Sequence, residues 1–439
     1  MQKYQDNIKN FTWFRILFTT RFYYPIYTIL FLDMGITIEQ FALLNTLWAV
    51  VIIIAEVPSG AFADTWGRKK LLVLTSVLMI IELGALLICP VGKTMWLIPA
   101  MIVNRVCSGL AEAAASGADE ALAYDSLILL KKENEWQNVL AKTSRFSSGI
   151  MLIAMVLGGV VYDQKIMGGL FSKEQIIKAP LLLTFIGAIL CFIVSLKFTE
   201  PELLGSEKNN NINSDESLKN KISKSLKLTM ETGSWILKTP VVLIAMIYGL
   251  CFDNCIRMFM TLGSQYNKAV GIPISMMGIV GGAMAFLGVF TPSVAKYLIE
   301  KFSFKTNMKI LFVFSMISFY FISKTYYLFG IIPSLVLGSS FFILNFMLSY
   351  YLNKFADSDK RATILSFKGL SFNIAYGLMG VMYAAYIKNL RVSINAEEVF
   401  AKGLSGFVYY LPLTFILTLI ITNLISSSHK KKCTELEKA

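Results

Sequence analysis

Residues 56–70 read Glu-Val-Pro-Ser-Gly-Ala-Phe-Ala-Asp-Thr-Trp-Gly-Arg-Lys-Lys, and this stretch decides the fold. It begins at the end of an apolar run of membrane length and ends in three consecutive cations that require water. Between these limits it holds a carboxylate at membrane depth, Glu56, and a turn that carries Asp64 and Arg68. Such an abrupt change from apolar to cationic residues is typical of the loop between two membrane-spanning helices.

The composition places the chain in a membrane. Of its 439 residues, 55% are hydrophobic and only 16% are charged, which is far from the balance of a soluble domain. The formal net charge of +13 would suit a nucleic-acid partner, but the cations stand in short loops between apolar runs, where they orient membrane helices. We therefore expect the lipid bilayer as a partner and no nucleic acid. The first apolar run, 11–32, is too long for the core of a signal peptide and is predicted as the first span.

Twelve apolar runs are long enough to cross a bilayer, whose hydrocarbon core needs roughly twenty residues per helix. The predicted spans are 11–32, 38–61, 71–89, 95–118, 143–162, 179–198, 240–262, 272–298, 308–323, 326–353, 364–386 and 404–426.

A polar segment divides these spans into two sets of six. The segment 199–238 is rich in asparagine and then in lysine, which predicts a cytoplasmic linker with an amphipathic surface helix over 217–232. The predicted organisation is an N-terminal six-helix bundle at 1–198, the linker, a C-terminal six-helix bundle at 239–427 and a cytoplasmic tail at 428–439.

Lysine and arginine gather in alternate loops, including 68–70 and the linker, so both termini are predicted to be cytoplasmic in a multi-pass protein of the plasma membrane.

The two halves of the chain share a short sequence pattern. Val57-Pro-Ser-Gly-Ala at the end of the second span recurs as Thr291-Pro-Ser-Val-Ala at the end of the eighth. This position fits two parallel six-helix repeats.

The loop after the second span resembles the Gly-x-x-x-Asp-x-x-Gly-Arg-Lys motif of the major facilitator superfamily. The matching residues are Gly60, Asp64, Gly67, Arg68 and Lys69. Gly67 permits a tight turn, and Asp64 could accept hydrogen bonds from Arg68. The resemblance implies an all-α integral membrane fold of twelve helices in two pseudo-symmetric six-helix bundles, and it implies that Asp64 and Arg68 latch the inward-closed state. The alternative is that Arg68 and its neighbours only set the membrane orientation.

A second resemblance lies in the fourth span, where Arg105 and Gly109 match the Arg-x-x-x-Gly motif of the same family. The family arginine faces the cavity and is associated with proton coupling, and the resemblance implies that role for Arg105. An arginine at bilayer depth needs a partner or a wet cavity. The candidate partners are Glu112, seven residues further along the span, Glu56 and Glu82. The alternative is a permanent ion pair that only holds helices together.

Two acids at the cytoplasmic end of the fourth span, Asp119 and Asp125, are candidates to complete the latch. They could meet Arg68 across the bundle and form a small charge relay such as the family uses. The alternative is that both are solvated acids at a helix end.

Further ionisable residues fall within apolar runs. Asp253 and Arg257 stand one helical turn apart and could form a self-neutralised pair, and Lys368 lies in the eleventh span. The candidate proton-coupling residues are Arg105, Glu112, Glu56 and Asp253. The candidate residues of a substrate cavity are Arg21, Tyr24, Tyr27, Glu82, Asn345, Asn373 and Tyr376. Their mixed polar and aromatic character suits an amphipathic molecule, although aromatic residues also serve as packing.

No cofactor or metal is expected. The six cysteines show no spaced framework, and the single histidine, His429, lies in the charged tail. Cys251 and Cys255 stand one helical turn apart, but without a further thiol or imidazole nearby they are interpreted as packing residues. An enzyme is not expected, because the chain shows no paired histidine and acid and no nucleophile elbow. A channel is disfavoured by the resemblance to a latch, and a monomer is expected.

The predicted function is secondary active transport by alternating access, with proton-coupled efflux of an amphipathic small molecule or drug. The form Glu56-x-Pro58 resembles clostridial tetracycline efflux proteins, which implies an antiporter of the multidrug or antibiotic-resistance kind, driven by the proton gradient. The fifth span lacks the Gly-Pro signature that drug-proton antiporters of the superfamily usually carry, and reads Gly149 to Gly159 without a proline. A proton-coupled importer of a small organic solute therefore remains the alternative.

Overall fold

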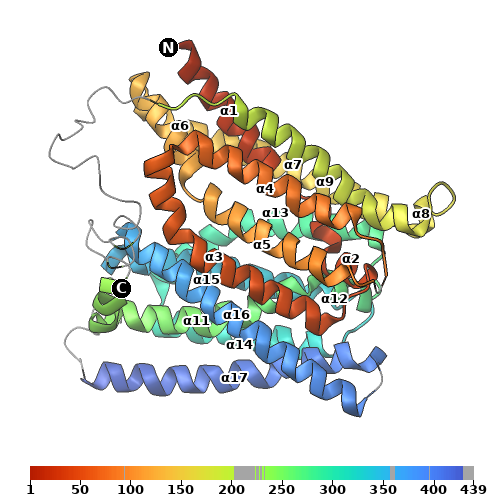
Figure 1. The fold of residues 1–439 in the computed structure, drawn as a ribbon. Helices are drawn as coiled ribbons and strands as arrows, with labels where there is room; N and C mark the ends of the chain where they lie inside the picture. Colours follow the sequence, from red (N-terminus) through yellow and green to blue (C-terminus); the bar gives the residue numbers. More distant parts are fainter. Residues whose placement is uncertain are drawn as a thin grey trace. The chain divides into compact units, whose positions relative to one another are not determined.

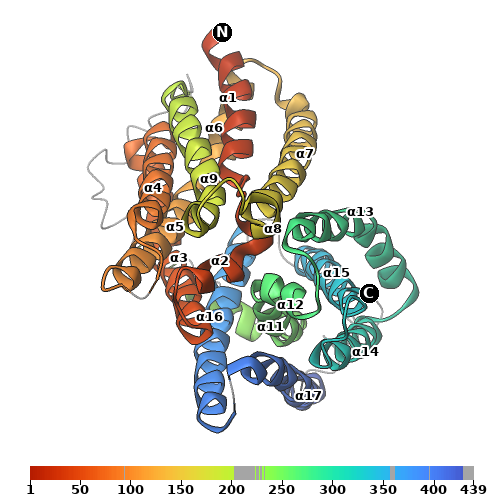
Figure 2. The same cartoon turned by 90° about the vertical axis from the view of Figure 1, so that its right-hand side faces the viewer.

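The computed structural model describes residues 1–92, 94–201, 223, 227, 230–231, 233–355, 361–394 and 396–428. This part of the chain forms helices and no strand, as expected for an all-α membrane protein (Figures 1 and 2). Eleven of its helical segments are long and apolar enough to cross a membrane. Most of the predicted linker helix at 217–232 and nearly all of the predicted tail at 428–439 lie outside the described residues.

The first predicted span, 11–32, is not one continuous helix. It is divided into α1 (Gln2–Thr19), the short 3-10 helix η1 (Tyr24–Ile26) and α2 (Tyr27–Asp33). Pro25 lies in the first turn of η1, where a backbone N–H would have no partner within the helix, so the N–H that proline lacks costs no helical hydrogen bond. At the break, the backbone N–H of Phe22 donates to the Thr184 hydroxyl at 3.1 Å instead of to its own helix. The interruption explains why this span is missing from the eleven continuous ones.

The other predicted spans each correspond to a helix. In the first half these helices, with their connecting turns, are α3 (Ile38–Trp66), α4 (Arg68–Ile88), α5 (Leu97–Ala115), α6 (Ala118–Leu129), η2 (Glu133–Glu135), α7 (Trp136–Tyr162), α8 (Gln164–Met167) and α9 (Lys173–Leu196). In the second half they are α11 (Pro240–Thr261), α12 (Gly263–Ala269), η3 (Ile274–Met276), α13 (Met277–Lys301), α14 (Phe304–Ser323), α15 (Ile331–Phe355), α16 (Arg361–Ser393) and α17 (Ala396–Ser428).

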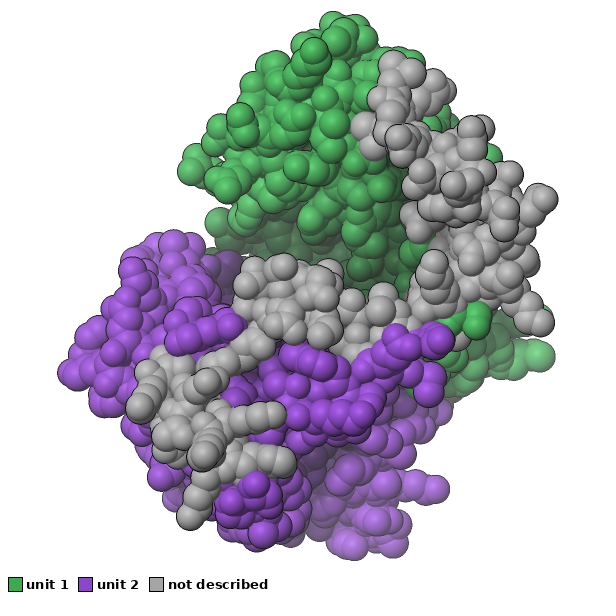
Figure 3. Space-filling model, turned by 90° about the vertical axis from the view of Figure 1, so that its left-hand side faces the viewer, with its two compact units in different colours: residues 1–36, 47–226, 274–279 green, residues 37–46, 227–273, 280–439 purple. Residues whose placement is uncertain are grey.

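The chain divides into two compact units, shown in different colours in Figure 3. Unit 1 comprises residues 1–36, 47–226 and 274–279, and unit 2 comprises residues 37–46, 227–273 and 280–439. These bounds differ from the predicted bundles at three places. The first turns of α3 belong to unit 2, η3 and the first three residues of α13 belong to unit 1, and the predicted linker 199–238 is divided between the two units at residue 226. In unit 1, α4 packs against α5 and α9, and α1 packs against α6, α7 and α9. In unit 2, α11 packs against α15, α16 and α17.

Helix α7 approaches the broken first span closely enough to exclude a side chain. A methyl group at Gly158 would lie 1.7 Å from the Phe22 carbonyl oxygen and 2.7 Å from its carbonyl carbon. Only glycine allows backbone to lie against backbone in this way. Gly149 of the same helix faces open space, with nothing within 4 Å of an added methyl group.

Candidate functional site

The turn between α3 and α4 consists of a single residue, Gly67, at φ +94°. This conformation is one that glycine adopts without strain. Directly after the turn, Arg68 forms an ion pair with Asp125 of α6. The structure therefore brings together two of the residues predicted for the latch. Gly60 is exposed and has open space around it, whereas the side chain of Asp64 lies outside the described residues.

A carboxylate that the sequence analysis did not single out holds the start of α4. Glu200, four residues after the end of α9, accepts hydrogen bonds from the backbone N–H of Arg68 at 2.9 Å and of Lys69 at 2.8 Å. The first N–H groups of a helix have no partner within the helix, and a negative charge there is favoured by the helix dipole. Glu200 thus connects the end of the sixth span to the predicted latch. Its position in a polar segment gave no signal of this role.

We expect Glu200→Gln to loosen the start of α4. The glutamine amide has one oxygen in place of two, so it can accept only one of the hydrogen bonds from Arg68 and Lys69, and the negative charge is gone. Together these losses should cost about 1 kcal/mol of local stability. In purified protein, hydrogen exchange of the backbone amides at 68–72 should then be about fivefold faster. The control is Glu174→Gln, because the Glu174 carboxylate pairs with Lys178 at the surface and should leave those amides unchanged. Equal amide exchange at 68–72 in both variants would refute the proposed role of Glu200 at the start of α4.

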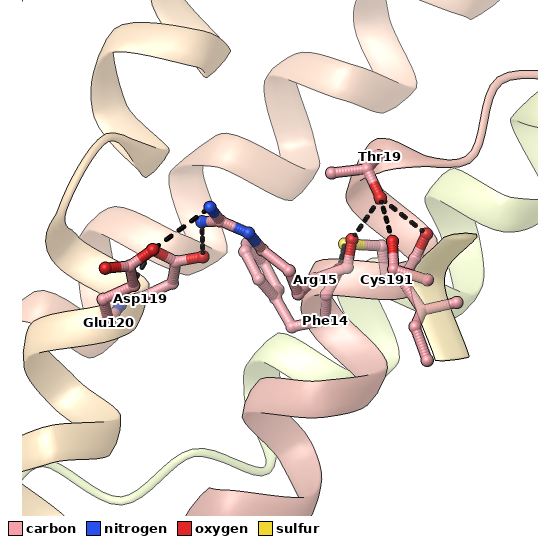
Figure 4. A network of polar contacts seen from close by, with 8 residues as sticks. Phe14, Arg15, Thr19, Asp119, Glu120 and Cys191 are labelled. Carbon is pink, nitrogen blue, oxygen red and sulfur yellow. Dashed lines mark hydrogen bonds and ion pairs between the residues drawn. The ribbon is translucent and has the colours of Figure 1, made fainter. Parts of the chain in front are cut away.

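Asp119, the other acid predicted to reach Arg68, contacts a different arginine. Arg15 of α1 donates to Asp119 at 2.5 Å and to Glu120 at 3.2 Å. Figure 4 shows the Arg15 guanidinium pointing from α1 toward these two carboxylates at the start of α6. Asp119 is fully buried, so this ion pair attaches α6 to α1 within unit 1. Arg15 appears in no motif, and only the packing of α1 on α6 reveals its partner.

A buried ion pair lies deeper in unit 1. Arg21, at the break of the first span, reaches a Glu82 carboxylate oxygen of α4 at 3.3 Å. Glu82 is completely inaccessible and Arg21 is 5% exposed. The Ser108 hydroxyl lies nearby, but neither Glu82 oxygen has a well-formed hydrogen bond among the described residues. A carboxylate with spare acceptor capacity in such a place is unusual.

Arg105 of α5 lies close to this pair but has uncharged partners. Its guanidinium donates to the Asn104 amide oxygen at 2.8 and 2.5 Å and to the Tyr27 hydroxyl. It also lies over the Phe31 ring at 4.9 Å. Within the described residues it forms no ion pair with Glu112 or with the other acids suggested for it. Its charge interacts with that of Glu82 at longer range.

The other two acids named for unit 1 are more accessible. Glu112 is exposed and Glu56 is half-buried, and in the described part of the chain neither carboxylate forms a hydrogen bond or an ion pair. Tyr24 is 44% exposed and packs edge-on against Tyr23 with ring centroids 5.5 Å apart. Tyr27 packs beside both rings.

Unit 2 holds a second polar cluster. Asp253 and Arg257 form the ion pair that their spacing predicts, and Arg257 also donates to the Asn373 amide oxygen at 2.9 Å. The Arg257 guanidinium lies 5.1 Å from the centre of the Tyr376 ring. Lys368 donates to the Asn345 amide oxygen at 3.4 Å. The three unit 2 residues predicted for a cavity therefore surround two cations.

Charged groups inside membrane helices are costly and usually mark routes of substrates or protons. Each unit carries such a cluster, and each is built from helices that are distant in the sequence. The described residues contain no group of three or more histidine, cysteine, aspartate or glutamate side chains that could hold a metal ion. Each of the two clusters contains an ion pair between residues of its own unit.

Comparison with known proteins agrees with this architecture. A family model described as Major Facilitator Superfamily matches residues 14–380. Among solved structures, the nucleoside transporter NupG superimposes with a TM-score of 0.70 at 12% identity, covering 96% of this chain and 99% of that one. The xylose transporter XylE from E. coli, in a partially occluded inward-open conformation, gives 0.61 at 13% identity, covering 95% and 99%.

A bacterial homolog of the human lysosomal transporter Spinster, in an inward-facing conformation, gives a TM-score of 0.65 at 13% identity, with 98% of both chains covered. At these identities the likeness concerns the fold. No curated protein matches the sequence.

Proposed function

Because the chain belongs to the major facilitator superfamily, we propose that it is a secondary transporter that couples export of an amphipathic small molecule to the proton gradient. The family and the transporter structures that share the fold make it a membrane transporter rather than an enzyme. In such folds two six-helix halves move about a site near the bilayer midplane. Coupling requires a group whose charge alters the balance between the two states.

The observation that supports proton coupling best is the environment of Glu82. This carboxylate is fully buried, 3.3 Å from Arg21, and its oxygens retain unused acceptor capacity. A proton on Glu82 would release Arg21 from its ion pair, so one titration changes the charge balance of the whole cluster. The sequence pointed first to Glu112, which is exposed and unpaired in the described chain. Glu82 therefore joins Arg105 and Glu112 as a proposed coupling residue.

The cargo is proposed to be amphipathic because aromatic and charged groups adjoin each other in unit 1. Tyr23, Tyr24 and Tyr27 form a cluster of rings beside Arg105, and the Tyr24 ring is partly accessible. Such walls bind molecules that carry both an apolar body and a polar group. Relatedness to tetracycline exporters rests on the sequence resemblance at Glu56 and Pro58 alone.

We expect Glu82→Gln to lose proton-coupled transport. A host that lacks its own pumps, tested against a compound panel with and without the protein, would identify the cargo. In vesicles loaded with a pH-sensitive dye, that compound should then drive proton movement in the wild type and at least about tenfold less in Glu82→Gln.

Glu174→Gln is the control for this experiment, since it removes a surface charge of similar size. Glu112→Gln, measured in parallel, separates the two candidate acids. Normal compound-driven proton movement in both Glu82→Gln and Glu112→Gln, with protein amounts unchanged, would contradict the assignment of coupling to this cluster.

Import is the second candidate function. Two solved structures of the same fold are those of a nucleoside transporter and a D-xylose-proton symporter, and the fifth span lacks a Gly-Pro signature. Whether cells with the protein lose or accumulate the identified compound decides between the two directions. The location in the plasma membrane with cytoplasmic termini, and the monomeric state, stay predictions.

A further inference from the structure

Lys368 is a membrane-embedded cation that has no acidic partner in the described part of the chain. It stands two turns inside α16, and its ammonium group reaches the Asn345 amide of α15 at 3.4 Å and the Phe372 ring at 5.4 Å. No carboxylate lies within ion-pair distance of it among the described residues. The side chains of Lys368 and Asn345 are both partly accessible. A cation in a membrane helix needs water or an anion nearby.

Asp253, the acid near Lys368 that the structure describes, is already engaged. Asp253 is 2% exposed and forms its ion pair with Arg257 on the next turn of α11. In the described part of unit 2, the remaining acidic residues lie at helix ends or in the polar segment, namely Glu39, Glu231, Glu300, Glu397 and Glu398. Among the described residues, the interior of the unit therefore holds two cations, Arg257 and Lys368, and one anion, Asp253, which is a positive excess.

Hydrogen-bond donors are in excess as well. The Arg257 guanidinium has five N–H groups, and two of its nitrogens donate to Asp253 and Asn373. The ammonium group of Lys368 makes one hydrogen bond of a possible three. Both amide oxygens in the cluster, those of Asn345 and Asn373, already accept from these cations. The group that would complete the cluster is an acceptor with negative charge.

We propose that the transported substrate is an organic anion and that Lys368 and Arg257 of unit 2 bind its acidic group. This inference rests on the proposed transport function and narrows its substrate class. The charges of Arg257 and Lys368 act on each other, and a guanidinium and an ammonium group in one cluster suit a carboxylate, sulfonate or phosphate. The Arg257 side chain is 24% accessible, so an anion can approach it without breaking the ion pair to Asp253.

Charged thiol reagents can test the site without knowledge of the natural cargo. In a background with the native cysteines replaced by serine, Asn345→Cys places a thiol next to Lys368. The thiol is reacted with methanethiosulfonate ethylsulfonate, which is an anion, and with the trimethylammonium-ethyl reagent, which is a cation. Each rate is divided by the rate of the same reagent with free cysteine, which corrects for the intrinsic reactivity of the reagent. We expect the normalised rate of the anion to exceed that of the cation at least about fivefold.

The preference should fall when Lys368→Gln is added to Asn345→Cys, but not when Lys309→Gln is added, because Lys309 is an exposed cation on α14. Asn373→Cys, beside Arg257, provides a second reporter if the first variant folds poorly. Equal rates, a preference for the cation, or thiols that react only after denaturation would overturn the proposal. The thiol-reagent experiment does not test proton coupling, so its failure would not affect that assignment. In the same way, normal proton coupling in Glu82→Gln would not affect the preference for the anionic reagent at Asn345→Cys.

Discussion

Replacement of Gly158 by alanine is expected to destabilise unit 1 by about 3 kcal/mol or more. The new methyl group would stand 1.7 Å from the Phe22 carbonyl oxygen. That oxygen belongs to the backbone and a Cβ has no rotamer, so no side-chain movement can relieve the clash. Helix α7 would have to separate from the break of the first span. That movement would weaken the hydrogen bond between Thr19 and Ser147, which is 3.0 Å long.

The measurement is the apparent melting temperature of the purified protein in detergent. Gly149→Ala, in the same helix, is the matched control, because its methyl group enters open space and alanine favours the helix by about 1 kcal/mol over glycine. We therefore expect Gly149→Ala to melt at or slightly above the wild-type temperature and Gly158→Ala to melt many degrees below it. Similar melting of the two variants would show that the close approach of α7 to Phe22 is absent.

The second large effect is expected for Arg21→Met. This change leaves Glu82 fully buried without its counter-ion, and loss of one partner of a buried pair typically costs about 3–5 kcal/mol. Replacement of both partners removes the uncompensated charge. The double variant Arg21→Met/Glu82→Leu should therefore recover at least half of the lost stability, although it should not restore coupled transport.

An exposed ion pair of unit 2 supplies the control. Arg391 of α16 pairs with Glu39 of α3 at 2.6 Å, but the Arg391 side chain is 42% accessible. Exposed pairs contribute at most about 1 kcal/mol, so Arg391→Met should change the melting temperature little. If the double variant is no more stable than Arg21→Met alone, Glu82 does not depend on Arg21 for its burial.

Local features of the sites were predictable from the sequence because their partners are close along the chain. Asp253 and Arg257 pair across one helical turn, and Gly67 forms the turn that its motif requires. Asp125 was expected to reach Arg68, and the structure contains an ion pair between these two residues. In that case the family resemblance supplied the partner, since the two residues come from different helices.

Contacts between helices distant in the sequence were not predictable in the same way. The fourth-span acid Asp119 contacts Arg15 of α1, and Glu200 holds the start of α4. An apolar run has the same hydropathy whichever face it turns to its neighbours, so hydropathy does not reveal which helices meet or how they are rotated. The interruption of the first span did have a signal in the sequence, namely the polar residues Thr20 and Arg21 followed by Pro25, but the overall hydropathy of the run did not reveal it.

The sequence alone determined that this protein is a helical membrane transporter of a known superfamily. Apolar runs of membrane length and alternate cationic loops suffice for the membrane fold, because the bilayer imposes them on any such chain, and the motif at residues 60–69 indicates the superfamily. Tertiary packing alone decided which charges on different helices neutralise each other. It paired Glu82 of α4 with Arg21 and left Lys368 of α16 with the Asn345 amide of α15, because the partner of such a charge depends on which helix faces pack together.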